Sequence, residues 1–281
     1  MQLGTFRLRM LNAGTFRLDG GAMHGVVPKT LWSTLVPCDE LNRVPYSTGC
    51  LLVEGNGRCI LIETGNGDKY SQRDRQLYAM EERTIATALA AIDVPLDSID
   101  LVVLTHLHFD HVGGATRLEG LTLRPTFPRA RHVVQARELE DATHVHERNR
   151  ASYLSKDFVP LLEAGLLDRV EGEVEVAPGV RVLPTPGHCA GHQSVLIDGG
   201  GGERALFLGD VVPTSVHVRL PFIMAYDLEP AVTLDTKRTL FERAIDEGWL
   251  LCFGHDPEVD AVRLRHDDTG RPVISERVKV D

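Results

Sequence analysis

Four side chains that commonly bind metal ions lie within six residues of this 281-residue chain: His106, His108, Asp110 and His111. They belong to the run Thr-His-Leu-His-Phe-Asp-His-Val-Gly-Gly at residues 105–114. An apolar stretch at residues 99–104 comes directly before the run, and we expect it to form a buried strand. Imidazole nitrogen and carboxylate oxygen suit divalent ions such as zinc, manganese or iron. The run therefore predicts a metal site where a strand ends.

The spacing of the four residues predicts two groups of ligands. Side chains alternate along an extended chain, so His106, His108 and Asp110 project to one side while the chain stays extended. His111 breaks this alternation and needs a change of direction at Asp110. If the chain turns into a helix there, His106 and His108 serve one metal, and Asp110 and His111 serve a second one nearby. A cluster of surface histidines or a mononuclear site is the alternative.

Apolar periodicity predicts strands that alternate with a few helices. We expect a hairpin of residues 49–54 and 58–63, because Asn56-Gly57 is a strong turn signal between two apolar runs. One hairpin in each half ends at an acidic residue, Glu63 or Asp210, which suggests two similar halves. Further strands are expected at residues 6–10, 16–18, 193–197, 205–208 and 249–253, helices at residues 82–92 and 231–246, and a mostly helical insertion at residues 141–167.

Composition and charge narrow the class of protein. The net charge is −10 at pH 7, and an acidic surface repels phosphate backbones, so nucleic acid is not expected as a partner. The N-terminus lacks the apolar core of a signal peptide, and no stretch approaches the roughly 20 apolar residues of a membrane span. The five cysteines form no Cys-x-x-Cys pair, which favours free thiols in a reducing compartment. We therefore expect a cytoplasmic protein with no membrane partner.

The pattern His-x-His-x-Asp-His followed by Gly-Gly resembles the metal-binding motif of the metallo-β-lactamase superfamily. Members of that superfamily need three further ligands, and this chain offers one in each of three later motifs. They are His188 in Thr-Pro-Gly-His-Cys-Ala-Gly-His, Asp210 after Leu-Phe-Leu-Gly, and His255 in Phe-Gly-His-Asp. The resemblance covers residues 16–255 and implies an α/β fold, the αββα four-layer sandwich. It also implies one domain over residues 1–281, with the site at one edge between the sheets.

The resemblance assigns a role to each of the seven candidate ligands. It implies that His106, His108 and His188 bind one metal, that Asp110, His111 and His255 bind the other, and that Asp210 and a water or hydroxide bridge the two. Two divalent ions are implied, with Zn²⁺ expected first and Mn²⁺ or Fe²⁺ as alternatives. The hydroxide would cleave an ester-like bond of a small-molecule substrate, which makes the protein a metal-dependent hydrolase. A homodimer is left open.

The chain resembles one branch of the family, the lactonases and the aryl-ester and phosphotriester hydrolases. This resemblance implies that the bond cleaved is a lactone, an ester or a phosphotriester. Acyl-homoserine lactonases share the phrase His-x-His-Phe-Asp-His-x-Gly-Gly, but they carry a tyrosine shortly after the bridging aspartate, where this chain has Pro213. A glyoxalase II-like thioester hydrolase is an alternative, with Lys237 and Arg238 as candidates to hold a glutathione carboxylate. An iron-dependent persulfide dioxygenase on the same fold and a non-catalytic scaffold are alternatives from other classes.

Asp110 and His217 are the candidate catalytic residues. His217 lies seven residues after Asp210, where it either donates a hydrogen bond to the substrate or leaving group or lies on the surface. Glu63 stands where the family usually has aspartate, and it either orients a ligating histidine or is an ordinary loop residue. Tyr226, together with residues 222–224, either lines a partly apolar substrate pocket or packs in the core.

Three further residues lie near these motifs. His192 is expected to pack at its turn rather than to bind a metal, because one histidine of that turn is enough as a ligand. Cys189 is expected to be a small buried side chain, since no Cys-His-Asn arrangement is visible that would activate it. His24 lies in a glycine-rich stretch that either reaches the mouth of the site or is structural.

Overall fold

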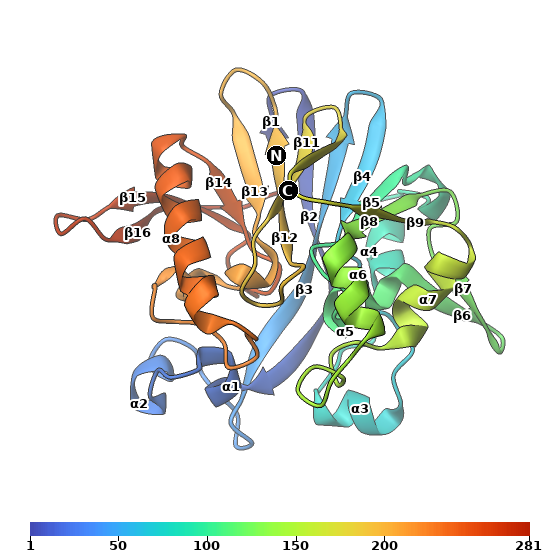
Figure 1. Ribbon diagram of the computed structural model, residues 1–281, viewed down its shortest axis with the longest axis horizontal. Helices are drawn as coiled ribbons and strands as arrows, with labels where there is room; N and C mark the ends of the chain where they lie inside the picture. The colour runs from blue at the N-terminus through green and yellow to red at the C-terminus, as the bar shows by residue number, and fades with distance from the viewer.

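Two seven-stranded sheets form the centre of the structure, a computed structural model that describes residues 1–281 (Figure 1). One sheet holds, in spatial order, β1 (Gln2–Leu3), β2 (Phe6–Asp19), β3 (Arg43–Gly55), β4 (Arg58–Ile62), β5 (Leu101–Val103), β8 (Arg131–Gln135) and β9 (Leu167–Val170). The other holds β10 (Val174–Ala177), β11 (Val180–Pro184), β12 (Gln193–Asp198), β13 (Arg204–Phe207), β14 (Leu250–Cys252), β15 (Ala261–His266) and β16 (Pro272–Val278).

A layer of apolar side chains fills the space between the two sheets. Leu51, Val53 and Ile60 enter it from the first sheet, and Val182 and Val195 enter it from the second. All five side chains are almost completely buried, so this layer removes much apolar surface from water. Because both sheets contribute to one core, we propose that residues 1–281 fold as one domain.

Helices cover the outer faces of both sheets. α4 (Ile85–Ala90), α6 (Ala136–Thr143) and α7 (Ser155–Glu163) pack on the first sheet, and α8 (Pro230–Asp246) packs on the second through Leu240, Phe241 and Ala244. Figure 1 shows α8 on one side of the strands and the other three helices on the opposite side. The expected αββα sandwich is therefore confirmed.

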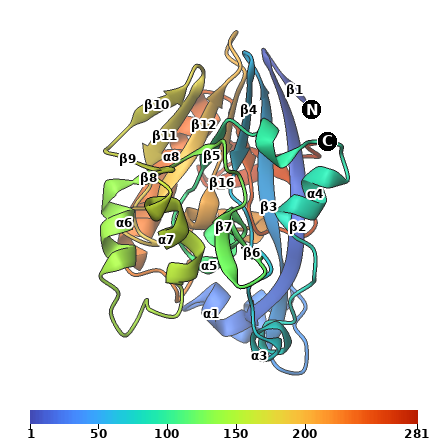
Figure 2. The same ribbon diagram turned by 90° about the vertical axis from the view of Figure 1, so that its right-hand side faces the viewer.

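Short elements connect these layers. α1 (Gly20–His24) and α2 (Lys29–Trp32) follow β2, α3 (Gln72–Leu77) follows β4, and α5 (Phe109–Val112) follows β5. β6 (Thr116–Glu119) pairs with β7 (Thr122–Pro125) outside the two sheets. In Figures 1 and 2, α5 lies near the lower ends of the strands, whereas the chain termini lie nearer the upper ends.

The two sheets repeat one pattern of strand pairing. In the first sheet β2–β3 and β3–β4 are antiparallel, and β4–β5 is parallel. In the second sheet β11–β12 and β12–β13 are antiparallel, and β13–β14 is parallel. The predicted similarity of the two halves is confirmed, and each half brings the ends of two parallel strands to the same edge of its sheet.

Most elements expected from the sequence form, with three corrections. The strands expected at residues 6–10 and 16–18 are parts of one strand, β2. The hairpin at Asn56-Gly57 is confirmed, and both turn residues have positive φ. The helix expected at residues 82–92 is shorter, because Thr84 caps α4 by accepting a hydrogen bond from the Thr87 N–H. The segment 141–167 is not mostly helical. Residues 144–154 form an irregular turn, in which the side chain of Asn149 accepts a hydrogen bond from the backbone of His146.

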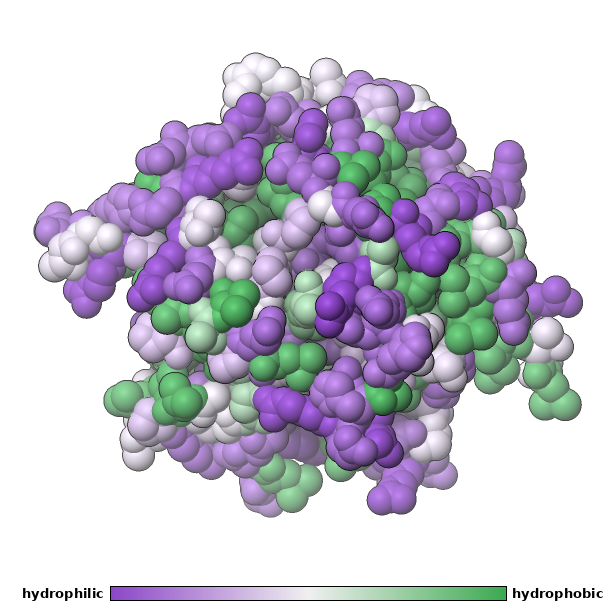
Figure 3. All heavy atoms as spheres, viewed as in Figure 1, coloured by the Kyte–Doolittle hydropathy of each residue, from purple (hydrophilic) through white to green (hydrophobic).

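The surface and the cysteines agree with an ordinary folded domain. The face shown in Figure 3 is a mosaic of hydrophilic and hydrophobic areas. All five cysteines are free thiols, as expected. None of the helices combines the length and the apolar character that crossing a membrane requires.

Candidate metal centre

The predicted change of direction at Asp110 is present in the structure. After β5 the chain bends at Thr105, is extended at His108 and enters α5 at Phe109. His106 and His108 therefore lie before the helix, whereas Asp110 and His111 lie on its first turn. All four side chains are buried.

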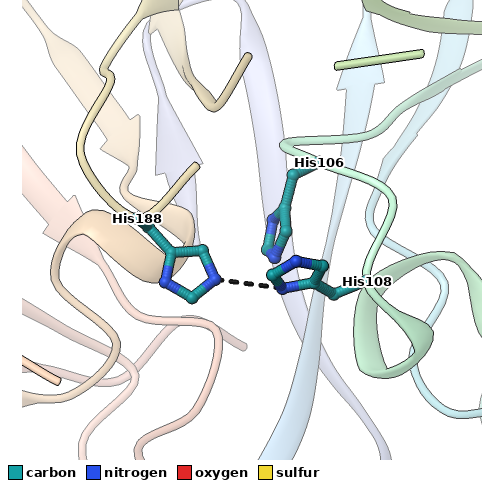
Figure 4. Close-up of side chains that lie close together, drawn as sticks. All are labelled: His106, His108 and His188. Carbon is teal, nitrogen blue, oxygen red and sulfur yellow. Dashed lines mark hydrogen bonds between the residues drawn. The ribbon is translucent and has the colours of Figure 1, made fainter. Parts of the chain in front are cut away.

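The structure brings all seven candidate ligands to one place. His188 comes from the turn between β11 and β12, Asp210 follows β13, and His255 follows β14. Their ligand atoms form three overlapping groups, each with all atoms within 4.8 Å: His106, His108 and His188; His106, His111 and Asp210; and Asp110, His111 and His255. Figure 4 shows the imidazoles of the first group pointing toward one another.

Distances within the cluster show that Asp210 contacts both groups of histidines. Nδ1 of His108 lies 3.1 Å from Nε2 of His188 in one group, and Nε2 of His111 lies 3.0 Å from Nε2 of His255 in the other. Oδ2 of Asp210 is 3.4 Å from Nε2 of His188, and its Oδ1 is 3.1 Å from Nε2 of His255. The carboxylate thus lies between two sets of nitrogen ligands.

Unpaired polar atoms at the centre fit a site for cations. Nε2 of His106 and Oδ1 of Asp210 are buried and make no hydrogen bond within the protein. A buried polar atom without a partner is costly, and coordination to a divalent cation would satisfy both atoms. The chemistry of the set, imidazole nitrogen with carboxylate oxygen and no thiolate, suits zinc and similar ions.

The electrostatics of the cluster favour an ionised Asp210 but act on its histidines in opposite directions. Burial, followed by the neighbouring histidines, lowers the pKa of His106 and His108 well below the usual value, which leaves their lone pairs free. Burial acts to raise the pKa of Asp210, but the neighbouring His111, His255 and His188 outweigh it and hold that pKa well below its usual range. Burial acts to lower the pKa of His111, His188 and His255, but the charge of Asp210 outweighs it and raises all three. Metal binding requires neutral imidazoles and an ionised carboxylate, so ions bound at these three histidines would displace their protons.

Glu63 orients one histidine of the cluster. Nδ1 of His111 lies 3.1 Å from Oε2 of Glu63, and the other carboxylate oxygen accepts the Thr105 N–H at 2.6 Å. This bond directs Nε2 of His111 toward His255 and Asp210. Of the two interpretations of Glu63, the structure supports the orienting one, because the carboxylate is buried rather than in an open loop.

Asp227 plays the same part for His188 and was not anticipated from the sequence. Its Oδ1 lies 2.9 Å from Nδ1 of His188, and its Oδ2 accepts the hydroxyl proton of Thr233 at 2.7 Å. Asp227 is the only acidic residue between positions 211 and 228, in an otherwise apolar or neutral segment with one arginine and one histidine. A single acidic residue in such a segment is the sequence signal that could have identified Asp227.

His192 is placed as expected, outside the groups of ligands. Its Nε2 accepts the backbone N–H of Asp210 at 3.0 Å, and its Nδ1 lies 2.8 Å from the hydroxyl of Thr185. Burial lowers the pKa of His192 to about 3, so the ring stays neutral and can accept that bond. His192 therefore fixes the backbone of Asp210. Cys189 is buried beside His188, and its thiol donates to Glu138.

His217 is buried and has both ring nitrogens engaged. Nε2 lies 2.9 Å from the carbonyl of Met23, and Nδ1 lies 2.7 Å from the hydroxyl of Thr214. The ring stacks on His24, which is itself stacked on Trp32. The surface position considered for His217 is wrong, and in this structure neither ring nitrogen is free to bond to a substrate. His24 likewise does not reach the mouth of the site.

A cavity opens directly onto the cluster. Its walls combine five of the candidate ligands with apolar and aromatic side chains: Leu18, Met23, Tyr46, Tyr78, His108, Phe109, Asp110, Ala151, Ser152, His188, Asp210, Met224, Tyr226 and His255. Tyr226 and Met224 line it as considered, whereas Phe222 packs in the core beside Trp32. The cavity therefore offers a partly apolar space to a substrate.

The two cations considered for a glutathione carboxylate lie elsewhere. Lys237 is completely buried, and its ammonium donates to the carbonyls of Arg219 and Phe222. Burial lowers its pKa to about 7. Arg238 pairs with Asp235 on the exposed side of α8. Neither side chain lines the cavity.

The fold and this cluster define a class of protein, and comparison with known proteins agrees. The sequence profile of the metallo-beta-lactamase superfamily matches residues 43–255, which is more than half of the chain. The chain therefore belongs to the metallo-β-lactamase superfamily, and it is a metallo-hydrolase of that superfamily.

Individual relatives narrow the comparison. The chain is 29% identical over 265 residues to an N-acyl homoserine lactonase of Bacillus cereus, a match that covers 90% of this chain and 94% of the relative. A crystal structure of a probable metal-dependent hydrolase from Staphylococcus aureus has a TM-score of 0.91 and 30% identity, and the match covers 99% of this chain and 98% of that one. The dizinc quorum-quenching lactonase AidC shares the fold, with a TM-score of 0.81 and 15% identity over 100% of this chain and 97% of that one.

Proposed function

We propose that this protein is a two-metal hydrolase that opens lactone rings, with N-acyl homoserine lactones as the substrate class. The observation that carries the proposal is the position of Asp210, whose two carboxylate oxygens contact histidines of both groups beneath the cavity. A carboxylate in that position is suited to bridge two cations. Similarity to N-acyl homoserine lactonases over nine-tenths of the chain supports the choice of substrate.

In this proposal His106, His108 and His188 would hold one metal, Asp110, His111 and His255 would hold the second, and Asp210 would serve both. When bound, such a pair would lower the pKa of a bound water molecule, polarise the substrate oxygen and stabilise developing negative charge. Zinc is the proposed ion, because the donor set suits it and because AidC is a dizinc lactonase.

The residues around the cavity have complementary roles in the proposal. Met23, Phe109 and Met224 form an apolar wall for the acyl chain. Asp110 lines the cavity beside them. Its carboxylate would take a proton from the attacking water as the new C–O bond forms, and give it to the alkoxide oxygen as the C–O bond of the ring breaks. Because both nitrogens of His217 are engaged, His217 has no part in this proposal.

The alternatives are less well supported by the same geometry. A glyoxalase II-like enzyme would need a cation at the cavity, and Lys237 and Arg238 lie elsewhere. A mononuclear oxygenase would not need Asp210 between two groups of histidines. A scaffold without activity typically loses ligands, and all seven are in place here.

The experiment is a measurement of metal content with a panel of substrates. We expect two ions per chain and faster turnover of N-acyl homoserine lactones than of thioesters or phosphotriesters. His111→Ala and Asp210→Ala should abolish lactone hydrolysis while circular dichroism shows an unchanged fold. Wild-type rates in both variants would refute the two-metal mechanism, and a preference for thioesters would refute the proposed substrate class.

A further inference from the structure

We propose that Glu138 is a positioning residue that sets the metal affinity of one half of the cluster, the group His106, His108 and His188. Glu138 is far from the cluster in sequence and lies in the first turn of α6, on the outer side of the first sheet. The inference rests on the proposed function, because it presupposes that this group binds a metal.

A single buried carboxylate joins the two chain segments that carry this group. Oε1 of Glu138 accepts the backbone N–H of Leu107 at 2.9 Å, and Leu107 lies between His106 and His108. Oε2 accepts the thiol proton of Cys189 at 3.0 Å, and Cys189 directly follows His188. The side chain of Glu138 is 0% exposed, so no water competes for either bond. Losing the carboxylate would leave both donors buried without an acceptor.

The packing around Glu138 shows that the contact is built into the fold. A Cβ atom at Gly191 would lie 2.2 Å from the backbone nitrogen of Glu138, so only a residue without a side chain lets the turn rest directly on α6. Tyr153 is buried on the same side, and its ring packs edge-on against His108 with centroids 4.6 Å apart. The positions of His108 and His188 therefore both depend on the surroundings of this one carboxylate.

Glu63 provides an internal comparison, because it is a second buried carboxylate that accepts a backbone hydrogen bond from the segment between β5 and α5. It accepts the Thr105 N–H, two residues before the amide that Glu138 holds. Its second oxygen bonds to His111, a member of the other group of ligands. Glu63 therefore supports the group Asp110, His111 and His255, whereas Glu138 supports the group His106, His108 and His188. Substituting one or the other should weaken different metal positions.

The test is a titration of the metal-free protein with Zn²⁺ against a chromophoric chelator, which yields a Kd for each of the two ions. Removal of groups that support metal ligands typically weakens affinity by about 10–100-fold. We expect Glu138→Ala to raise one Kd by about that factor, and Glu138→Gln to raise it less, since the amide oxygen can still accept the Leu107 N–H. Glu63→Gln should raise the other Kd.

Two further variants assign each Kd to a position. His255→Ala damages the metal position formed by Asp110, His111 and His255. Adding Glu138→Gln to that variant should weaken the binding of the ion that remains at the other position. In His188→Ala the first position is damaged, and adding Glu138→Gln should leave the remaining Kd unchanged. Absorption spectra of the Co²⁺-loaded proteins report the geometry at each position without any measurement of activity. Glu138→Gln keeps the shape of the side chain, so the test does not depend on whether Glu138→Ala folds.

The outcomes separate this inference from the proposed function. The inference is overturned if Glu138→Gln and Glu138→Ala keep both Kd values within about twofold of wild type, a change well below that expected for a supporting residue. The inference is also overturned if the Glu138 variants raise the Kd values of both ions by the same factor. A wild-type chain that binds one ion, held by His106, His108 and His188, would refute the two-metal proposal and would still test Glu138 at that position. A wild-type chain that binds no ion would refute both.

Discussion

The carboxylate of Asp227 lies 2.9 Å from Nδ1 of His188 and leaves only Nε2 of that imidazole to face the cluster. Asp227 also anchors the segment before α8, because its Oδ2 accepts the hydroxyl proton of Thr233 in that helix. One aspartate thus connects the candidate ligand His188 to a helix on the outer face of the second sheet. The tautomer and the orientation of His188 depend on it.

We predict that Asp227→Ala weakens metal binding by about 10–100-fold and lowers the proposed lactonase activity in proportion at limiting zinc. Thr233→Val removes only the hydroxyl that steadies Asp227, so its effect should be smaller and in the same direction. The measurement is zinc affinity of the metal-free proteins by competition with a chelator. Equal affinity in wild type and Asp227→Ala would show that His188 is held in place by other contacts.

Gly209 is the second position at which a small change should reach the cluster. Its φ is +61°, and a Cβ atom there would lie 2.6 Å from Nε2 of His192 and 2.9 Å from Cβ of Thr105. Gly209→Ala therefore combines an unfavourable backbone conformation with a clash, and it should destabilise the protein by about 2 kcal/mol or more.

The same substitution should displace Asp210, because Nε2 of His192 accepts the N–H of Asp210. We therefore expect Gly209→Ala to lose metal as well as stability, measured by chemical denaturation and by metal content. Gly57→Ala, at a turn with positive φ but nothing within 4 Å of the added Cβ, is the control. It should lose stability only. Full metal content in Gly209→Ala would show that the contact with His192 is not needed to position Asp210.

Tyr226 offers a test of how the cavity uses its hydrogen-bond donors. It is 39% exposed at the cavity wall, and burial, followed by the charge of Asp19, raises its pKa to about 12. The phenol therefore stays protonated and can donate to a substrate oxygen across the working pH range. Tyr226→Phe should lower kcat/KM by about tenfold, the usual worth of one hydrogen bond, with metal content unchanged. An unchanged kcat/KM would assign Tyr226 to the apolar wall alone.

Local patterns in the sequence predicted the first part of the cluster and the hairpins. The run at residues 105–114 and the turn at Asn56-Gly57 each consist of consecutive residues. The alternation of side chains and the turn type can therefore be predicted from neighbouring residues. The three later ligands lie in separate motifs, and only the resemblance to a family connected them with the run. The structure places all seven together.

Two supporting residues, Asp227 and Glu138, escaped prediction because their contacts join distant parts of the chain, whereas Glu63 was a candidate only through the resemblance to a family. Asp227 is 39 residues from His188, and Glu138 is 31 residues from Leu107 and 51 from Cys189. No periodic pattern marks such pairs. His217 was a candidate because it lies close to Asp210 in sequence, a signal that does not fix where the ring points. The short 3-10 turn Ser215–Val218 instead directs its ring into the interior beside His24.

His132 provides a prediction about stability that is independent of the metal centre. Its side chain is 0% exposed on β8, and neither ring nitrogen makes a hydrogen bond. Burial lowers its pKa to about 4, although the nearby carbonyls of Leu166 and Ala130 favour the proton. The unfolded chain, with a pKa near the ordinary value of about 6.5, binds a proton more readily than the folded protein does.

The contribution of neutral His132 to stability is therefore fully present above pH 6.5 and is lost as the pH falls toward 4. A shift of this size corresponds to about 3 kcal/mol lost across that interval. His132→Leu removes the titrating group and two unpaired buried nitrogens, so it should raise stability at pH 7 and flatten the decline below pH 6.5. Denaturation of both proteins in the metal-free state at several pH values from 7 to 4 measures the difference, because the histidines of the cluster titrate alike in both proteins. Parallel profiles for the two proteins would show that His132 finds an acceptor when it is protonated.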